Sequence, residues 1–233
     1  MIRKILTGCG CIDTSMEGGI SPGSVILIYG EPETGKTTLA IQCAVNCAMQ
    51  GLKVLFVDCD NTFSPKRLAQ LSSGKFDEVA ELIILMRPTD FKEQTVVADR
   101  LGDYTAKGFG LVVIDTVTGL YRARVAETSG KAFGLSRELN RQLANIAQTA
   151  KLQKIPVVMT SQVHGVFSET SETSVAPVAT RVLKFWADEV IAMKPTENAQ
   201  VIKAVLEETR RRPQETFCYL RIEESGIHDY SVY

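Results

Sequence analysis

A glycine-rich segment with a lysine and hydroxyl side chains at its end carries the clearest chemical signal, Gly30-Glu31-Pro32-Glu33-Thr34-Gly35-Lys36-Thr37-Thr38. Its spacing fits the pattern G-x-x-x-x-G-K-S/T. The backbone N–H groups of such a loop surround one point at the positive end of the next helix, where an anionic phosphate is stabilised. Lys36 would place a charge on the β- and γ-phosphates, and the Thr37 hydroxyl would help to hold Mg²⁺. The segment predicts a nucleoside triphosphate site.

The residues on either side of this loop distinguish a phosphate site from a chance match. The apolar run Val25 to Tyr29 precedes the loop, and a helix-like stretch from Thr37 to Gln50 follows it. A strand that leads into a glycine loop, which then opens a helix, is the setting in which the pattern binds phosphate. Gly51 fits the left-handed position that closes such a helix. We therefore favour the phosphate site.

A carboxylate at the end of an apolar strand is the next candidate. Leu111 to Ile114 are four apolar residues, and Asp115 follows them directly. Such an aspartate, the Walker B pattern, accepts from the water shell of a Mg²⁺ ion held beside the loop threonine. By itself the pattern is weak, because many buried strands end in Asp. Together with the glycine loop, it predicts that Thr37 and Asp115 form the metal site.

Two other strand ends carry polar side chains that could act on the terminal phosphate. Asp60 follows one strand and is our candidate to polarise the attacking water; the alternative is that Asp58 or Asp60 only caps the next turn. Gln162 follows another strand, and its amide could sense the γ-phosphate, with an ordinary polar loop residue as the alternative. Open α/β sheets bind ligands at the carboxyl ends of their strands. The predicted catalytic residues are Lys36, Asp60, Asp115 and Gln162.

Short apolar runs alternate with helical patterns along most of the chain. Four runs are typical of parallel strands covered on both faces: Val54–Val57, Leu82–Leu85, Leu111–Ile114 and Pro156–Met159. Helical patterns lie at Gln94–Ala106 and on the face formed by Leu135, Leu139, Leu143, Ile146 and Ala150. The last part of the chain has three strand signals, and no helical pattern of sufficient length separates them. They are Arg181–Ile191, Val201–Leu206 and Phe217–Ile222. We predict an α/β fold, with a mostly parallel central sheet, helices on both faces and a C-terminal antiparallel edge.

Length and composition fit a single domain that spans residues 1–233. The 26 basic and 27 acidic residues leave no overall positive field, so a surface for nucleic acid must be local. No run approaches the ~20 apolar residues of a membrane span, so we expect no membrane partner and a cytoplasmic location. The six cysteines fit reduced, buried thiols. A structural metal at Cys43 and Cys47 is less favoured, because neither histidine has ligand spacing to them.

Four further segments are specific in combination. They are Thr7-Gly8 to Gly23-Ser24, the strand-end segment Asp58 to Leu68, Leu120-Tyr121-Arg122, and Thr160-Ser161-Gln162-Val163. They resemble the RecA-type recombinase family, and within it the short archaeal paralogues of the recombinase RadA. The likeness covers nearly the whole chain. It implies a RecA-type P-loop ATPase core that uses ATP and Mg²⁺, and it places Arg67 where the family stacks an arginine on adenine. A surface arginine after a Pro turn is the alternative for Arg67.

The resemblance also implies that two loops bind single-stranded DNA. The first, roughly Tyr121 to Gly134, is locally basic with an aromatic side chain, although a solvated loop is the alternative. Its candidate contacts are Tyr121, Arg122, Arg124 and Lys131. The second loop, roughly Val163 to Thr180, could meet DNA through Phe167 and backbone amides. Its two glutamates should repel phosphate, so we expect modest, salt-sensitive binding.

Two departures from the family pattern bear on activity. Asp60 stands where the family has a catalytic Glu, and its shorter carboxylate would fall about 1 Å from its place, which costs on the order of 10²-fold in rate. We therefore predict a slow, DNA-dependent ATPase. The family's N-terminal helix-hairpin-helix domain and the linker Phe that docks on a neighbouring subunit are missing from this sequence. We expect no extended filaments of the protein alone.

Three functions stay open at this point. The leading one is a DNA repair and recombination ATPase that binds single-stranded DNA and assists or regulates RadA. The resemblance implies RadA as a partner, with Holliday-junction-processing proteins as further partners. The second is a true strand-exchange recombinase, against which Asp60 and the missing linker argue. The third is a RecA-fold signalling ATPase of the circadian-clock type, which has no DNA role and would not need Leu120-Tyr121-Arg122.

Overall fold

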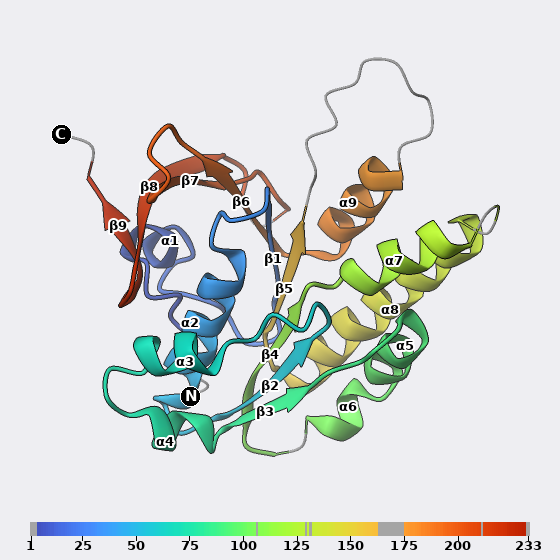
Figure 1. The fold of residues 1–233 in the computed structure, drawn as a ribbon, viewed down its shortest axis with the longest axis horizontal. Coiled ribbons are helices and arrows are strands. Elements are labelled where there is room, and N and C mark those ends of the chain that lie inside the picture. Colours follow the sequence, from blue (N-terminus) through green and yellow to red (C-terminus); the bar gives the residue numbers. More distant parts are fainter. Residues whose placement is uncertain are drawn as a thin grey trace.

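A single sheet organises the residues that the computed structural model describes, which are 4–105, 107–128, 130, 132–162, 175–210 and 212–231, with backbone alone for 175–178. Within this part of the chain, nine strands lie in the order β3-β2-β4-β5-β1-β6-β7-β8-β9 (Figure 1). The strands are β1 (Val25–Gly30), β2 (Lys53–Asp58), β3 (Ile83–Met86), β4 (Phe109–Asp115), β5 (Val157–Gln162), β6 (Glu189–Pro195), β7 (Val201–Leu206), β8 (Thr216–Glu223) and β9 (Gly226–Tyr230).

The pairing divides the sheet into two parts. The strands from β3 across to β6 are parallel to their neighbours, whereas β6 to β9 pair antiparallel. The predicted fold class is confirmed. Because parallel strands end at the same edge, the register sets Asp58 beside Asp115 and Gly30 beside Gln162. That edge is where open α/β sheets bind their ligands.

Helices cover both faces of the sheet (Figure 1). Two separate apolar clusters mark the two faces. One face packs against α1 (Gly10–Ser15), α2 (Lys36–Ala48), α3 (Pro65–Leu71) and α4 (Phe76–Ala80). The other packs against α5 (Phe91–Asp99), α6 (Leu101–Tyr104), α7 (Gly119–Glu127), α8 (Ala132–Gln153) and α9 (Val175–Trp186).

The first predicted strand of the C-terminal part is wrong over most of its length. Residues 181–186 belong to helix α9, and only β6 begins near the end of the predicted strand. Ala179 and Leu183 lie four residues apart and are both buried, so the segment presents a helical face. Its β-branched and aromatic residues concealed that face, because such residues favour strands. β6 pairs parallel with β1 on one side and antiparallel with β7 on the other, so the predicted antiparallel edge begins at β6.

Two other predicted elements differ in detail. The predicted helix from Gln94 begins earlier, because the Asp90 carboxylate accepts from the backbone N–H of Glu93 at 2.7 Å and caps α5. It is also interrupted after Asp99, and α6 follows as a separate short helix. The strand predicted at Leu82–Leu85 is not covered on both faces. It is the edge strand β3, and Ile84 and Leu85 are 39% and 36% exposed.

The cysteines are predicted correctly in part. Cys9, Cys43, Cys47 and Cys59 are buried free thiols. Cys11 and Cys218 form a disulfide that joins α1 to β8, so the prediction that all six are reduced is wrong.

Among the helices described, none is long and apolar enough to cross a membrane.

Candidate nucleotide-binding site and the adjoining helix

The glycine loop occupies the short connection between β1 and α2, as the sequence predicts. Gly35 has a left-handed backbone with φ of 83°, and a Cβ atom there would lie 3.0 Å from the Cδ1 atom of Ile222. A side chain at this position would be both strained and crowded. No side chain of the described residues caps the first turn of α2. The amides at the start of this 13-residue helix are therefore free to bind an anion.

Lys36 supplies a buried cation beside these amides. Only 6% of the Lys36 surface is exposed to solvent. The Nζ atom donates to the carbonyl oxygen of Glu31 and to Oγ1 of Thr34, the latter at 3.3 Å. Burial lowers the pKa of Lys36 to about 8, although the negative charges of Asp115 and Glu31 oppose the change. A buried ammonium among unpaired amides fits the phosphate groups of a nucleotide.

Asp115 lies at the end of β4 and is fully buried. Its Oδ1 atom accepts from the hydroxyl of Thr160, and its Oδ2 atom accepts from Oγ1 of Thr62 at 3.4 Å. The Thr37 hydroxyl also hydrogen-bonds this carboxylate. Burial raises the pKa of Asp115, and the hydrogen bonds from Thr160 and Thr37 oppose the rise. A carboxylate and a hydroxyl at the loop offer the oxygen ligands that Mg²⁺ prefers.

Asp58, the last residue of β2, and Asp60, two residues further on, make different contacts. Asp58 accepts from the backbone N–H groups of Thr62 and Phe63 at 2.9 and 3.2 Å, so it caps the following turn. Asp60 accepts from Oγ1 of Thr116 at 2.9 Å instead. The turn-capping alternative therefore describes Asp58 and not Asp60. Burial raises the pKa of Asp60, while the hydrogen bond from Thr116 and the charge of Arg122 lower it.

Gly119 leaves room for the Asp60 carboxylate. A Cβ atom on Gly119 would lie 1.8 Å from Oδ1 of Asp60. The first residue of α7 must therefore be glycine if the carboxylate is to keep its position. Sequence reasoning missed Gly119. This glycine and Asp60 come close together only because the carboxyl ends of β2 and β4 lie side by side in the sheet.

Arg67 is held by the turn between β8 and β9. Its Nη1 and Nη2 atoms donate to the carbonyl oxygens of Glu224 and Glu223, both at 2.7 Å. Nη1 also donates to Oε1 of Gln70 at 3.2 Å. These bonds fix the plane of the guanidinium, and a fixed plane is suited to stacking on a base. Adenine stacking by Arg67 stays a prediction.

The predicted first DNA loop is largely helical. Residues 119–127 form α7, and α8 begins at Ala132. Tyr121 is 1% exposed and packs edge-on against Phe91, with ring centroids 5.7 Å apart. Its burial is at odds with the predicted contact between Tyr121 and DNA. Arg124 is exposed and pairs with Glu127 at 3.1 Å.

Of the other predicted DNA contacts, Arg122 lies on α7 beside the end of β5. Lys131 and Phe167 lie outside the described residues, as does most of the second loop. The end of that loop, from Val175, belongs to helix α9. Gln162 is the last residue of β5 and is half-buried. The guanidinium of Arg122 contacts it from α7.

A buried amide pair anchors the segment that joins Asp115 to α7. Nε2 of Gln94 donates to the carbonyl oxygen of Val117 at 3.0 Å and to Oε1 of Gln142 at 2.9 Å. On the opposite side, Oγ1 of Thr118 lies 2.9 Å from Oγ of Ser161. The connection from Asp115 to α7 is thus fixed by two helices and by β5.

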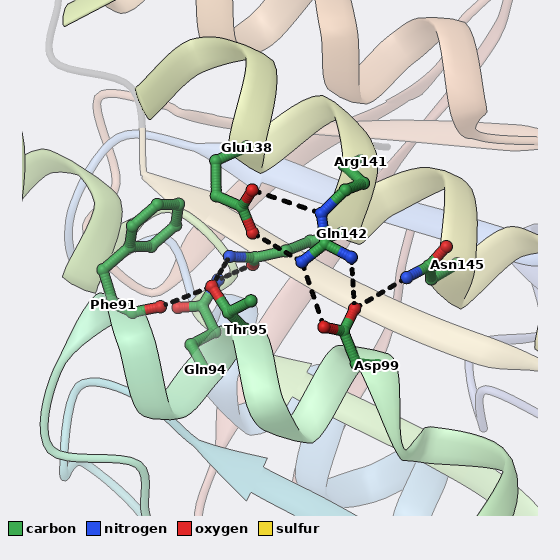
Figure 2. A network of polar contacts seen from close by, with 8 residues as sticks. All are labelled: Phe91, Gln94, Thr95, Asp99, Glu138, Arg141, Gln142 and Asn145. Carbon is green, nitrogen blue, oxygen red and sulfur yellow. Dashed lines mark hydrogen bonds and ion pairs between the residues drawn. The ribbon is translucent and has the colours of Figure 1, made fainter. Parts of the chain in front are cut away.

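The amide pair belongs to a larger polar network between α5 and α8 (Figure 2). Arg141 on α8 bonds Asp99 on α5 at 2.7 Å and Glu138 on its own helix at 2.7 Å. Sequence reasoning missed this network. A signal was present, because Gln142 falls on the buried face of α8 beside Leu139 and Leu143. A polar residue on an apolar helix face usually has a buried partner.

Comparison with known proteins places this site in a family. The chain matches the Rad51 family over residues 1–230. With the parallel sheet and the glycine loop at its carboxyl edge, this match shows that the chain belongs to the Rad51 family.

Several relatives share the name DNA repair and recombination protein RadB. The chain is 36% identical to that protein from Thermococcus kodakarensis, over 96% of this chain and 98% of the relative. It is 30% identical to the one from Pyrococcus furiosus, over 97% and 95% of the two chains. A structure described as the crystal structure of the RadB recombinase matches with a TM-score of 0.78 and 33% identity, over 97% of this chain and 100% of that chain. The predicted resemblance is confirmed.

Proposed function

We propose that the chain is a single ATPase unit of DNA recombination that binds ATP with Mg²⁺ and hydrolyses it slowly. One observation carries the nucleotide part of this proposal. The buried Lys36 ammonium, the uncapped start of α2 and the pair formed by Thr37 and Asp115 converge at the end of β1. The buried ammonium and the free amides suit an anion, and the buried carboxylate suits a divalent cation. A nucleotide with bound Mg²⁺ has both charges.

The residues divide the proposed chemistry among them. Lys36 and the first amides of α2 bind the phosphates, and Arg67 orients the base by stacking on it. Thr37 and Asp115 would hold Mg²⁺, which neutralises charge on the phosphates when bound. Asp60 orients and polarises the attacking water, and Gln162 senses the γ-phosphate. We expect slow hydrolysis, because the side chain of Asp60 is short and is held to Thr116.

The names of the relatives support a role in recombination. Arg122 and Arg124 on α7 are the candidate contacts for single-stranded DNA among the described residues. We propose that the protein assists RadA on such DNA, with Holliday-junction-processing proteins as further partners. Membership of the Rad51 family favours this class of function over a signalling ATPase.

The test is ATP hydrolysis with and without single-stranded DNA, beside sedimentation of the same sample. We expect slow hydrolysis that DNA accelerates, no long polymers, and loss of hydrolysis in Lys36→Ala. A strand-exchange assay separates an assisting role from a true recombinase. Absence of nucleotide binding and of DNA binding in the wild-type protein would contradict the proposal.

A further inference from the structure

Arg122 joins the candidate DNA helix to the residues proposed for hydrolysis. It lies in the first turns of α7 and is half-buried. Its Nη1 atom lies 3.5 Å from the backbone carbonyl oxygen of Gln162, and its Nη2 atom lies 3.5 Å from Oε1 of the same residue. The guanidinium charge also acts on the carboxylate of Asp60. One side chain therefore faces both the proposed γ-phosphate sensor and the proposed water-activating group.

One of the two contacts holds the Gln162 side chain, and the other holds the guanidinium against the backbone of the same residue. A single guanidinium reaches both the main-chain oxygen and the side-chain oxygen of this residue. The Gln162 side chain must therefore lie alongside its own backbone on the side of α7. While the contact from Nη2 persists, the Gln162 side chain is held toward α7 and does not turn toward a phosphate.

The contacts are also easy to replace. At 3.5 Å they lie at the upper limit of hydrogen-bond length, where such bonds are weak. A guanidinium–phosphate bond is charged on both sides, forms at roughly 2.7–2.9 Å, and is about twice as strong as a neutral bond. A DNA phosphate near α7 would thus compete successfully with Gln162 for Arg122.

We propose that Arg122 is a positioning residue that restrains Gln162 in the DNA-free protein, and that a phosphate of single-stranded DNA withdraws its guanidinium and frees Gln162 for the γ-phosphate. This inference rests on the proposed function and adds the regulation of the same site. Binding is reciprocal: if DNA favours a bound triphosphate over a diphosphate by some factor, the triphosphate favours DNA by the same factor.

The test measures equilibrium binding and does not depend on turnover. The dissociation constants of the ATP analogue AMP-PNP and of ADP, both with Mg²⁺, give a selectivity for the γ-phosphate. We expect Arg122→Ala to raise this selectivity by about twofold, the factor that a net hydrogen bond at the weak end of the usual range is worth. Addition of oligo(dT) should raise the selectivity of the wild-type protein similarly and leave that of Arg122→Ala unchanged.

Two further variants separate the restraint from a general disturbance of α7. Glu127→Ala changes an exposed residue of the same helix that has no proposed role in binding, and it should not change the selectivity without DNA. Gln162→Ala should remove the effect of Arg122→Ala, since the restraint acts through that side chain; this is a double-mutant cycle. Arg122→Lys keeps the charge but cannot contact both oxygen atoms of Gln162 at once. It is the variant to measure if Arg122→Ala does not fold.

The outcomes distinguish this inference from the proposed function. A wild-type protein that binds neither nucleotide contradicts the proposed function itself. If the wild-type protein binds nucleotides and DNA, but Arg122→Ala and Arg122→Lys both leave the selectivity unchanged or lower it, only the restraint by Arg122 is overturned. An equal gain in Glu127→Ala, or a gain that persists in the Gln162→Ala background, also overturns it.

Discussion

Replacing Lys36 by methionine should stabilise the nucleotide-free protein while it abolishes nucleotide binding. Burial moves the pKa of Lys36 from 10.5 to about 8. At about 1.4 kcal/mol per pKa unit, keeping this ammonium charged costs roughly 3 kcal/mol. The variant would lose the bonds to Glu31 and Thr34, each worth about 1 kcal/mol. A net gain of about 1–2 kcal/mol in unfolding free energy is expected at neutral pH.

The pH dependence gives this prediction its sign. Below pH 8, Lys36 is charged in both the folded and the unfolded protein, so the full cost is present. Between pH 8 and 10.5 the folded protein loses the proton first, so the wild-type protein gains stability as pH rises. By about pH 9.5, roughly 2 kcal/mol of the cost has gone. The advantage of Lys36→Met should therefore shrink or vanish there.

The assay is urea unfolding of both proteins at neutral pH and at about pH 9.5, without nucleotide, followed by calorimetry with AMP-PNP. Lys53→Met is the matched control, because Lys53 is exposed at the start of β2 and should change stability by no more than about 0.5 kcal/mol. A methionine variant less stable than wild type at neutral pH would refute the reasoning. So would an advantage that is independent of pH.

Three other substitutions test separate contacts. Gly119→Ala should slow hydrolysis on the order of 10²-fold and spare nucleotide affinity, because its Cβ atom would displace the Asp60 carboxylate; an unchanged single-turnover rate would contradict this. Cys218→Ser should lower unfolding free energy by about 2–4 kcal/mol through loss of the bond to Cys11; equal denaturation midpoints for variant and oxidised wild type would show that the bond contributes nothing. Arg67→Ala should weaken binding of AMP-PNP and of AMP alike, as loss of stacking on the base predicts, and a variant with unaltered affinity for both would remove that role.

Local sequence determined much of the fold. The strand before the glycine loop, the loop itself and α2 lie within some two dozen consecutive residues, so their signal is complete in one stretch. The Asp115 position follows from one apolar run. The parallel sheet follows from the alternation of such runs with helical patterns. These features need no knowledge of distant contacts.

The features that sequence reasoning missed depend on tertiary contacts. Cys11 and Cys218 are 207 positions apart, and only the packing of α1 on β8 brings them together. The family resemblance and the basic neighbours of Tyr121 predict a DNA contact, whereas Phe91 on a different helix packs against this ring and the side chain is buried. Helix α9 has strand-forming residues, and burial of its helical face prevails over their propensity.

The central claim is that a triphosphate and its Mg²⁺ bind between Lys36 and Asp115. Calorimetric titration of AMP-PNP into wild type and Asp115→Asn, with and without Mg²⁺, tests it most directly. We predict that Mg²⁺ strengthens binding to the wild-type protein at least tenfold, about 1.4 kcal/mol, and has little effect on the variant. No heat of binding in the wild-type protein, or the same Mg²⁺ dependence in both proteins, would contradict the account.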